Sequence, residues 1–336
     1  MFAIPDRTVH VTKLADWLEF CAIQSPNGRI GFSTLVSAAD MAAEEQPEDI
    51  SDEEIWEDEL VLSVQNEINS RSKCIGPDYP FTIDRRGLHL QLSDPITPIG
   101  SVYLFCLYLS HVTDRTVVPE NMIPNVNNDV RDLFQACATI AAAGYVQGIA
   151  VSFGWPRPDD ATFLEALRRT YAMFGDGLPH AEPRPAAPDR VKDEGIDVIA
   201  WQPSPDGLPG TAYLLGQSAS GDNWKDKSVK ADSELFHEYW FERRPGSRHQ
   251  DAMFMPFCLE PKKPGQDTTA QEVLVDLMQR LMSKFGLVFY RYRIASFSAR
   301  GLAVHQAGQA VVERVEDLPR VEAWVQECTA TIRTHV

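Results

Sequence analysis

Two short segments with alternating side chains constrain the fold of this chain more than any other feature. Residues 193–201 read DEGIDVIAW and residues 211–220 read TAYLLGQSAS, and apolar side chains recur at every second position in each. The turn-rich stretch PSPDGLPG separates them. Alternation of this kind, interrupted by glycine and proline, is typical of two strands that pair as an antiparallel hairpin.

The phase of the alternation places two polar side chains at one end of this hairpin. Asp197 lies near the start of the first strand and Gln217 near the end of the second. These ends meet in an antiparallel pair, and the two-residue period puts both side chains on one face of the sheet. Carboxylate and amide oxygens are ligands that Mg²⁺ takes in proteins. The sequence therefore predicts a cation site at this end of the sheet.

The remaining pattern predicts two domains. Residues 1–125 read as a mainly helical domain that contains one hairpin, 80–92, and a strongly apolar helix, 101–111. A loop rich in Asn and Pro at 118–128 marks the boundary. Residues 126–336 form the second domain.

The second domain alternates helices and strands around the hairpin. We expect helices at 130–141, 160–174, 233–243, 269–284 and 318–328, and further strands at 148–153, 252–259 and 286–294. Up to residue 259, and leaving out the helix at 160–174, the order is helix, three strands, helix, strand. This order predicts a mixed α/β domain with a single sheet.

The motif GIDVIAW, a turn, then LLGQSA resembles the restriction-endonuclease-like PD-(D/E)XK nuclease superfamily over roughly residues 128–260. The resemblance implies an αβββαβ core. It also implies that an acid on the second strand and a Glu or Gln on the third bind the metal, with a Lys two residues later. Asp197 and Gln217 stand at the first two positions.

The motif is degenerate at two other positions. Ala219 stands where the resemblance implies the Lys, and Gln135, in Leu133-Phe134-Gln135, stands where a helix Glu is expected. Lys225 and Lys227, in GDNWKDK just beyond the second strand, are candidates to replace the lysine. Glu194 is the candidate to replace the missing acid as a metal ligand.

The resemblance implies a Mg²⁺- or Mn²⁺-dependent DNA endonuclease, or a nuclease subunit, of a bacterial anti-phage or restriction system. Asp197, Gln217, Lys225 and Lys227 are its candidate catalytic residues; Asp197, Gln217 and Glu194 are its candidate metal ligands. The alternative is a catalytically inactive nuclease-like protein that serves a defence complex as a protein-interaction or DNA-binding subunit. Each of these residues also has a structural reading, such as a turn carboxylate for Asp197 and a buried amide for Gln217.

Composition narrows the other function classes. The six cysteines form no CxxC, the eight histidines form no HExxH, and there is no phosphate-loop, nucleophile-elbow or dinucleotide-binding glycine motif. No apolar run is long enough for a spanning helix, and the first residues lack a signal-peptide pattern, so we expect a cytoplasmic protein without membrane contact.

Charge is unevenly distributed along the chain. The net charge of −17 argues against a general nucleic-acid coat, but residues 44–59 alone carry ten acids. Residues 221–300 carry thirteen bases against eleven acids. We therefore expect a basic surface on the second domain, and an acidic helix at 51–70 that suits a protein partner or a homo-oligomer. The candidate members of the basic surface are Lys225, Lys227, Arg243, Arg244, Arg291 and Arg293. Arg291 and Arg293 are predicted to share one strand face, where a phosphate contact and a salt-bridge ladder remain alternatives.

Overall fold

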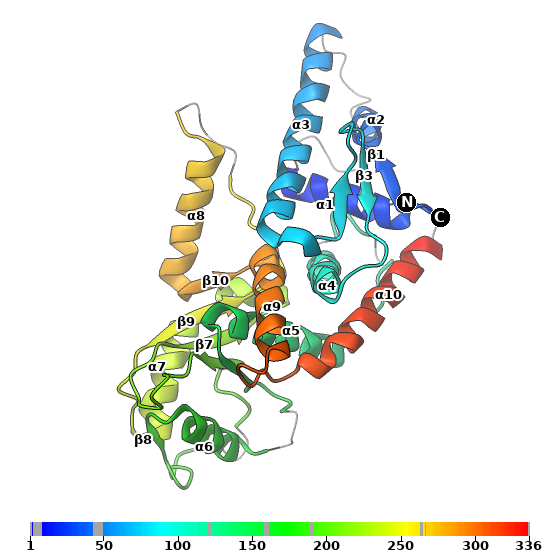
Figure 1. Cartoon of the computed structure of the whole chain (residues 1–336). Helices are drawn as coiled ribbons and strands as arrows, with labels where there is room; N and C mark the ends of the chain where they lie inside the picture. Colours follow the sequence, from blue (N-terminus) through cyan, green and yellow to red (C-terminus); the bar gives the residue numbers. More distant parts are fainter. Residues whose placement is uncertain are drawn as a thin grey trace. The chain divides into compact units, whose positions relative to one another are not determined.

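The computed structural model describes residues 2, 9–42, 50–113, 115–119, 122–157, 161–188, 191–262, 265 and 267–334. The chain is mixed α/β and divides into two compact units, coloured along the chain in Figure 1. The first unit runs to Asn127 and takes in Phe257–Glu260 and the stretch from Pro319. The second comprises Asn128–Pro256 and Pro261–Leu318. The final helix, assigned from the sequence to the second domain, therefore belongs almost entirely to the first unit.

The first unit combines helices with a small antiparallel sheet. Its elements are α1 (Val11–Gln24), β1 (Arg29–Gly31), α2 (Ser33–Ala42), α3 (Ile50–Ile75), η1 (Gly76–Asp78), β2 (Phe81–Ile83), β3 (His89–Leu92), α4 (Pro98–Thr113) and α10 (Leu318–Thr334). The sheet order is β1-β3-β2, with both pairs antiparallel. The hairpin predicted at 80–92 is confirmed as β2 and β3.

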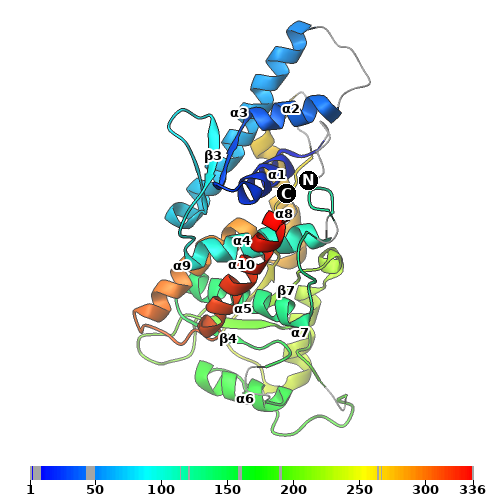
Figure 2. The ribbon, with the colours of Figure 1, turned by 90° about the vertical axis from the view of Figure 1, so that its right-hand side faces the viewer.

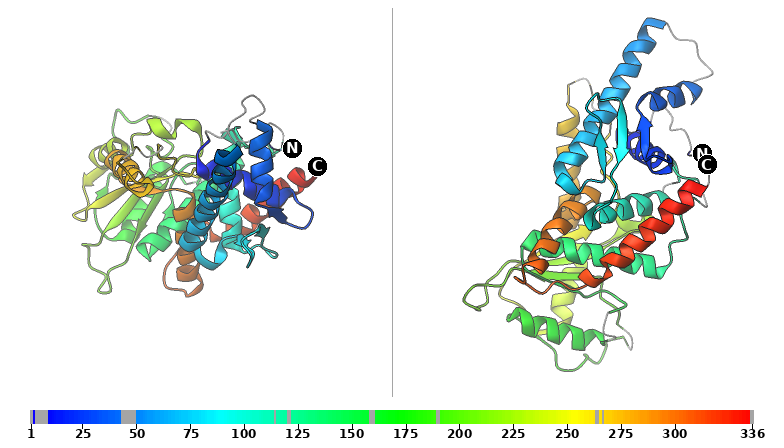
Figure 3. Two further views of the ribbon diagram at one scale, coloured as in Figure 1. Left: turned by 90° about the horizontal axis from the view of Figure 1, so that it is seen from above. Right: turned by 45° about the vertical axis from the view of Figure 1, so that its right-hand side comes forward.

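The apolar helix predicted at 101–111 is the buried centre of the first unit. Nearly every side chain of α4 is buried, and α10 runs beside it (Figures 2 and 3). The rings of Phe105 and Trp324 meet edge to face at 5.0 Å, and the Tyr108 hydroxyl lies 2.8 Å from that of Thr329. Helix α10, near the end of the chain, thus packs into the core of the first unit.

A buried charge network joins α1, α3 and α4 in this unit. The guanidinium of Arg71, with no exposed surface, donates to Asp16 at 2.7 Å, to Glu19 at 2.8 Å and to the carbonyl of Thr12 at 2.8 Å. His111 contacts the second Asp16 oxygen at 2.7 Å. Buried carboxylates are tolerated only when each is paired and hydrogen-bonded, so Arg71 is the residue on which this packing depends.

The second unit is built around one five-stranded sheet. Its helices and 3-10 turns are α5 (Asn128–Val146), α6 (Phe163–Phe174), η2 (Asp222–Asp226), α7 (Val229–Trp240), α8 (Ala270–Phe285), α9 (Arg291–Gln306) and η3 (Val315–Asp317). Its strands are β4 (Ile149–Ser152), β5 (Leu178–Pro179), β6 (Val198–Trp201), β7 (Tyr213–Ser218), β8 (Phe241–Arg243), β9 (His249–Phe254) and β10 (Leu287–Phe289).

The sheet order is β10-β9-β7-β6-β4. Strands β4, β6 and β7 are antiparallel neighbours, whereas β7, β9 and β10 are parallel. The predicted pairing of 195–201 with 211–218 is confirmed, with Val198 opposite Gly216 and Trp201 opposite Tyr213. β5 and β8 form a separate two-stranded sheet.

Helices cover both faces of the five-stranded sheet. On one face α5 packs on β4, β6 and β7, with α9 against α5. On the other face, alternate side chains of β6 and β7 join α6 and α7 in an aromatic core (Figure 1). That core holds Ile199, Trp201, Tyr213 and Leu215. Asp197 immediately precedes β6 and Gln217 lies near the end of β7, each one residue beyond the Val198–Gly216 pair, so the two residues meet at one end of the sheet.

The strand predicted at 286–294 is wrong beyond its first residues. Strand β10 ends at Phe289, and α9 begins at Arg291, so Arg291 and Arg293 lie on a helix. Arg291 is 1% exposed and donates to the carbonyl of Pro256 at 3.2 Å. Arg293 donates to the carbonyl of Val288 at 2.9 Å. Both guanidiniums donate to backbone carbonyls. The two-residue spacing of Arg291 and Arg293 in the sequence could not indicate these contacts.

Replacing Arg71 should destabilise the first unit severely. Arg71→Met leaves Asp16 and Glu19 buried without their cation, which typically costs about 3–5 kcal/mol. The matched control is Arg29→Met, because Arg29 pairs with Asp84 at 2.9 Å on the surface, where 44% of its side chain is exposed. Such a pair contributes about 0–1 kcal/mol. Urea unfolding of both variants measures the difference, and equal losses would contradict this account of the network.

The crossing of α5 and α9 should tolerate no side chain at Gly301. A Cβ there would overlap the carbonyl oxygen of Ile140, and one at Gly144 would overlap that of Phe297. Gly301→Ala must push the helices apart, for which overpacking costs of about 1–3 kcal/mol or more are typical. Gly246→Ala is the control, since its nearest atom is a flexible carboxylate oxygen at 3.9 Å. A thermal melt of Gly301→Ala unchanged from that of the parent chain would show that the crossing is not tight.

Candidate functional site

A tight turn immediately before β6 aims Asp197 into the site. The amide of Ile196 donates to the carbonyl of Asp193 at 3.0 Å, and the two residues between them have positive φ, 53° at Glu194 and 78° at Gly195. Positive φ is routine for glycine but uncommon for glutamate. A Cβ on Gly195 would also crowd the Asp232 carboxylate at 2.9 Å. The sequence DEGID therefore folds into a turn that only a glycine at its third position permits.

The Asp197 carboxylate is fixed by the neighbouring strand. Its Oδ2 accepts from the amide of Ser218 at 2.7 Å and from the Ser218 hydroxyl at 3.1 Å. Its own backbone is held on both sides, since its amide donates to Gly216 at 2.8 Å and its carbonyl accepts from Phe153 and Gly154. Oδ1 accepts no hydrogen bond from the described residues. One oxygen is thus anchored, and the other remains available to a ligand.

The Asp197 carboxyl has a pKa raised by its surroundings. Burial raises its pKa from 3.8 to about 7, and the nearby charge of Asp193 adds to the effect. The Ser218 hydrogen bonds and the charge of Lys227 act in the opposite direction but do not cancel it. A perturbed carboxyl in a cavity is typical of a functional site.

Two glutamine side chains lie beside this carboxylate. Gln217 is 4% exposed, and its Oε1 is buried without a hydrogen-bond partner among the described residues. Gln135 of α5 is 5% exposed and donates through Nε2 to the Ser152 hydroxyl at 2.8 Å. A Cβ added to Gly154 would overlap both Gln135 Oε1 and Asp197 Oδ1. These two oxygens therefore converge on the small space that Gly154 leaves open.

These side chains line one polar cavity of about 630 Å³. It is lined by Asn128, Arg131, Asp132, Phe134, Gln135, Trp155, Pro156, Lys192, Asp193, Gly195, Asp197, Gln217, Ser218, Ala219, Ser220, Gly221, Asn223 and Lys227. Asp132 is neutralised by Arg314, which donates to its two oxygens at 3.0 and 2.6 Å. Arg131, Lys192 and Lys227 supply positive charge around Asp193 and Asp197. A cavity with both basic and acidic side chains suits a bound anion together with a cation.

The structure separates the two candidate lysines. Lys227 lines the cavity, and its charge acts on Asp197. Lys225 is exposed and lies over the ring of Trp224, with its ammonium 5.6 Å from the ring centroid. Ala219, at the position where the resemblance implies a lysine, is 5% exposed. Of the predicted residues the cavity thus gathers Asp197, Gln217 and Lys227, but not Lys225.

The predicted ligand Glu194 does not line the cavity. The strained turn directs its side chain to the vicinity of Trp240, where burial raises its pKa. Its neighbour Asp193 lines the cavity instead. The residue pattern could not distinguish the two, because the reversal of direction depends on the positive φ of Glu194 and Gly195. Ser218 and Gly154 were also missed, since their roles arise from backbone proximity alone.

The residues proposed for a basic surface differ in exposure, since Lys225, Arg243 and Arg244 are exposed and Lys227 is half-buried at the cavity. Arg291 is buried, and Arg244 is paired with Glu234 at 3.5 Å and with Glu238 at 2.8 Å. The cations that reach the cavity, apart from Lys227, come from α5 and from the loop before β6. The acidic run 44–59 lies partly outside the described residues.

Sequence and structure comparisons supply no relative for this site. No family model, curated protein or solved structure matches the chain. Among the described residues, no helix has the length and apolar character needed to cross a membrane. Within the same residues, no three His, Cys, Asp or Glu side chains gather as a ready-made metal site.

Removing the Asp197 charge should stabilise the protein at high pH. Because the folded pKa is raised, the stability that protonation of Asp197 contributes is fully present below the unfolded pKa, falls as the pH rises from there, and is lost once the pH has passed about 7. Asp197→Asn keeps an oxygen for Ser218 but carries no charge. We expect its melting temperature to exceed that of the parent by a few degrees at about pH 8, with the difference vanishing near pH 4.

Asp206→Asn is the matched control, because Asp206 is an exposed turn residue that accepts from the Leu208 amide at 3.1 Å. It should change the melting temperature little at either pH. If Asp197→Asn instead lowers it equally at both, Asp197 acts only as a turn carboxylate.

Proposed function

We propose that this chain is a metal-dependent nuclease that hydrolyses phosphodiester bonds in DNA at the Asp197 cavity. The observation that carries the proposal is the unpartnered, buried Oε1 of Gln217 beside an Asp197 carboxylate whose Oδ1 is open. Leaving a buried oxygen unsatisfied costs about 1–3 kcal/mol, so a bound cation accounts for an arrangement that packing alone does not.

The topology of the second unit supports this proposal. When α6 and the separate β5–β8 pair are left out, its order is α5, β4, β6, β7, α7, β9, with β4, β6 and β7 antiparallel neighbours and β7 parallel to β9, which agrees with the αβββαβ order that the resemblance implies. We propose that this sheet is a restriction-endonuclease-like core. Asp197 then stands on the second core strand and Gln217 on the third, both at the end of the sheet that holds the cavity.

The residues present fit a hard divalent cation held loosely. Asp197 and the amide oxygens of Gln217 and Gln135 would hold Mg²⁺ or Mn²⁺, with Asp193 close enough to add its charge. A bound ion of this kind supplies a water of lowered pKa and neutralises charge on the phosphodiester. Since only one of the three oxygen ligands is a carboxylate, the site needs the substrate phosphate to complete it.

Lys227 takes the electrostatic role in this proposal. Positive charge close to the scissile phosphate stabilises the charge that develops in the transition state. Lys227 lies on the rim, in the loop before α7, and its charge reaches Asp197. Arg131 and Lys192 add charge that attracts the DNA backbone. The setting we propose, a bacterial anti-phage or restriction system, follows from the resemblance alone.

Two observations favour a second function. Ala219 stands at the expected lysine position, and the described residues contain no cluster of three metal-ligating acids, histidines or cysteines. Both features suit a nuclease-like subunit that binds DNA or a protein partner without cleaving it. Cleavage assays separate the two functions.

Plasmid and single-stranded DNA should be cleaved in the presence of millimolar Mg²⁺ or Mn²⁺, and chelation should stop the reaction. Asp197→Ala should abolish cleavage, and Lys227→Ala should lower the rate by about 10²–10³, as expected for loss of an electrostatic stabiliser. Lys225→Ala is the matched control from the same loop, and its rate should remain within about twofold of the parent, because this side chain lies on Trp224.

Filling the space at Gly154 tests the cation without removing a charge. Gly154→Ala places a methyl group between Gln135 Oε1 and Asp197 Oδ1, so it should also abolish cleavage. No divalent-dependent cleavage of either DNA by the parent chain would favour the non-catalytic subunit. Equal rates for Lys225→Ala and Lys227→Ala would exclude the role given to Lys227.

A further inference from the structure

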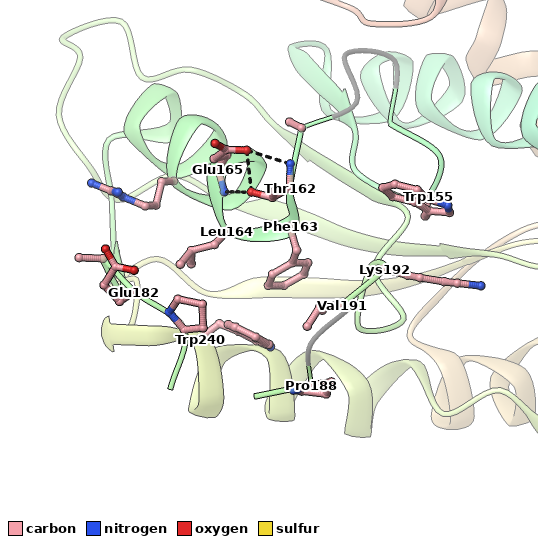
Figure 4. A pocket seen from close by; sticks show the side chains of 14 residues that line it. Trp155, Thr162, Phe163, Leu164, Glu165, Glu182, Pro188, Val191, Lys192 and Trp240 are labelled. Carbon is pink, nitrogen blue, oxygen red and sulfur yellow. Dashed lines mark hydrogen bonds between the residues drawn. The ribbon is translucent and has the colours of Figure 1, made fainter. Parts of the chain in front are cut away.

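A second cavity of about 780 Å³ lies beside the candidate site, between α6, the loop that follows it and the end of α7 (Figure 4). It is lined by Trp155, Ala161, Thr162, Phe163, Leu164, Glu165, Arg168, Ala181, Glu182, Pro183, Pro188, Val191, Lys192 and Trp240. Its volume falls in the range of small-molecule sites, and most of its wall is apolar or aromatic. The proposed reaction uses none of its interior.

The two cavities share a wall. Trp155 and Lys192 line both of them, and Figure 4 shows these two side chains together on one side of the second cavity. Trp155 directly follows Gly154, whose open side faces Asp197 Oδ1. One backbone step, about 3.8 Å, therefore separates the residue at the candidate cation site from the tryptophan.

Trp155 is presented as a supported flat surface. Its side chain is 48% exposed, which is unusual for so large an apolar group. The buried guanidinium of Arg157 lies 5.7 Å from its ring centroid. The same guanidinium donates to the carbonyls of Ala161, at 3.2 Å, and Lys192. Arg157 thus ties the ring to both segments of the cavity wall.

The cavity chemistry suits an aromatic ligand that belongs to a charged chain. Phe163 and Trp240 line it from the aromatic core, where they are 4% and 2% exposed with their ring centroids 4.6 Å apart, and Val191 lies near them (Figure 4). One oxygen of Glu165 is occupied by the helix cap, since it accepts from the Thr162 amide at 3.0 Å and hydroxyl at 2.6 Å. Arg168 and Lys192 add positive charge to the wall.

We propose that the two cavities form one track for single-stranded DNA, in which an unpaired base stacks on Trp155 and enters the second cavity. The inference rests on the proposed function, because the phosphate next to that base would lie at Asp197. Exposed aromatic rings beside basic side chains are the usual platform for unpaired bases, and they cannot stack on a base that stays paired within a duplex. The preferred substrate class is therefore unpaired DNA.

Fluorescence anisotropy tests the track with fluorescein-labelled oligo(dT) and with a labelled duplex of equal length, both in EDTA so that no cleavage occurs. The chain should bind oligo(dT) more tightly than the duplex. Trp155→Ala should weaken oligo(dT) binding by about tenfold or more without changing duplex binding, and Trp155→Phe should restore it to within about threefold. Lys192→Glu, a second change in the shared wall, should weaken oligo(dT) binding as well. Leu208→Ala, an exposed residue of the β6–β7 loop, is the control and should bind as the parent does.

The binding experiment and the cleavage experiment test the track and the proposed function separately. A chain that cleaves plasmid DNA with Mg²⁺, but binds oligo(dT) within about twofold of its normal affinity after Trp155→Ala, keeps the proposed function and overturns the track. A chain that never cleaves DNA, but loses oligo(dT) binding specifically in Trp155→Ala, overturns the nuclease and supports the track. An equal loss on oligo(dT) and duplex would overturn the unpaired-base site.

Discussion

The hydrogen bonds from Ser218 to the Asp197 carboxylate are the interaction on which the candidate site depends. They join the start of β6 to the end of β7, and the backbone of Asp197 binds the end of β4 at the same point. Three core strands therefore meet at one carboxyl group. Because one carboxylate oxygen is fixed by Ser218, the other has a defined direction, and it lies with Gln135 Oε1 around the space left open at Gly154. A cavity with this geometry needs the sheet to be complete before it can exist.

Packing elsewhere in the chain offsets the folding stability that is lost at the candidate site. A carboxyl whose pKa is raised to about 7 reduces folding stability at neutral pH, as does an unpartnered amide oxygen. Close glycine-to-backbone packing of α5 on α9 holds the helix that carries Gln135. In the Arg71 network, by contrast, the buried carboxylates of Asp16 and Glu19 are both paired with the guanidinium.

The two proposals share one physical logic. Charge is concentrated where a phosphate would lie, among Lys227, Arg131 and Lys192, and the exposed aromatic ring of Trp155 lies beside it. A polynucleotide presents the same pair of surfaces, an anionic backbone and flat bases. The overall charge of −17 does not oppose this, because recognition at close range depends on the local field within the cavity. In the proposed site, the sparse set of acidic ligands would make cation binding dependent on substrate.

The sequence by itself determined the elements that local chemistry controls. Two-residue alternation located β6 and β7 and their phase, which brought Asp197 and Gln217 to one end, and glycine and proline marked the connections. Tertiary structure decided the rest. The positive-φ turn places Asp193 rather than Glu194 at the cavity, and the path of η2 places Lys227 rather than Lys225 there. The end of a predicted strand is instead the start of α9, with Arg291 buried. Tertiary structure also returned α10 to the first unit. Each of these differences depends on contacts between residues distant in sequence or on the direction of the backbone. The spacing of side chains along the chain specifies neither the contacts nor the direction.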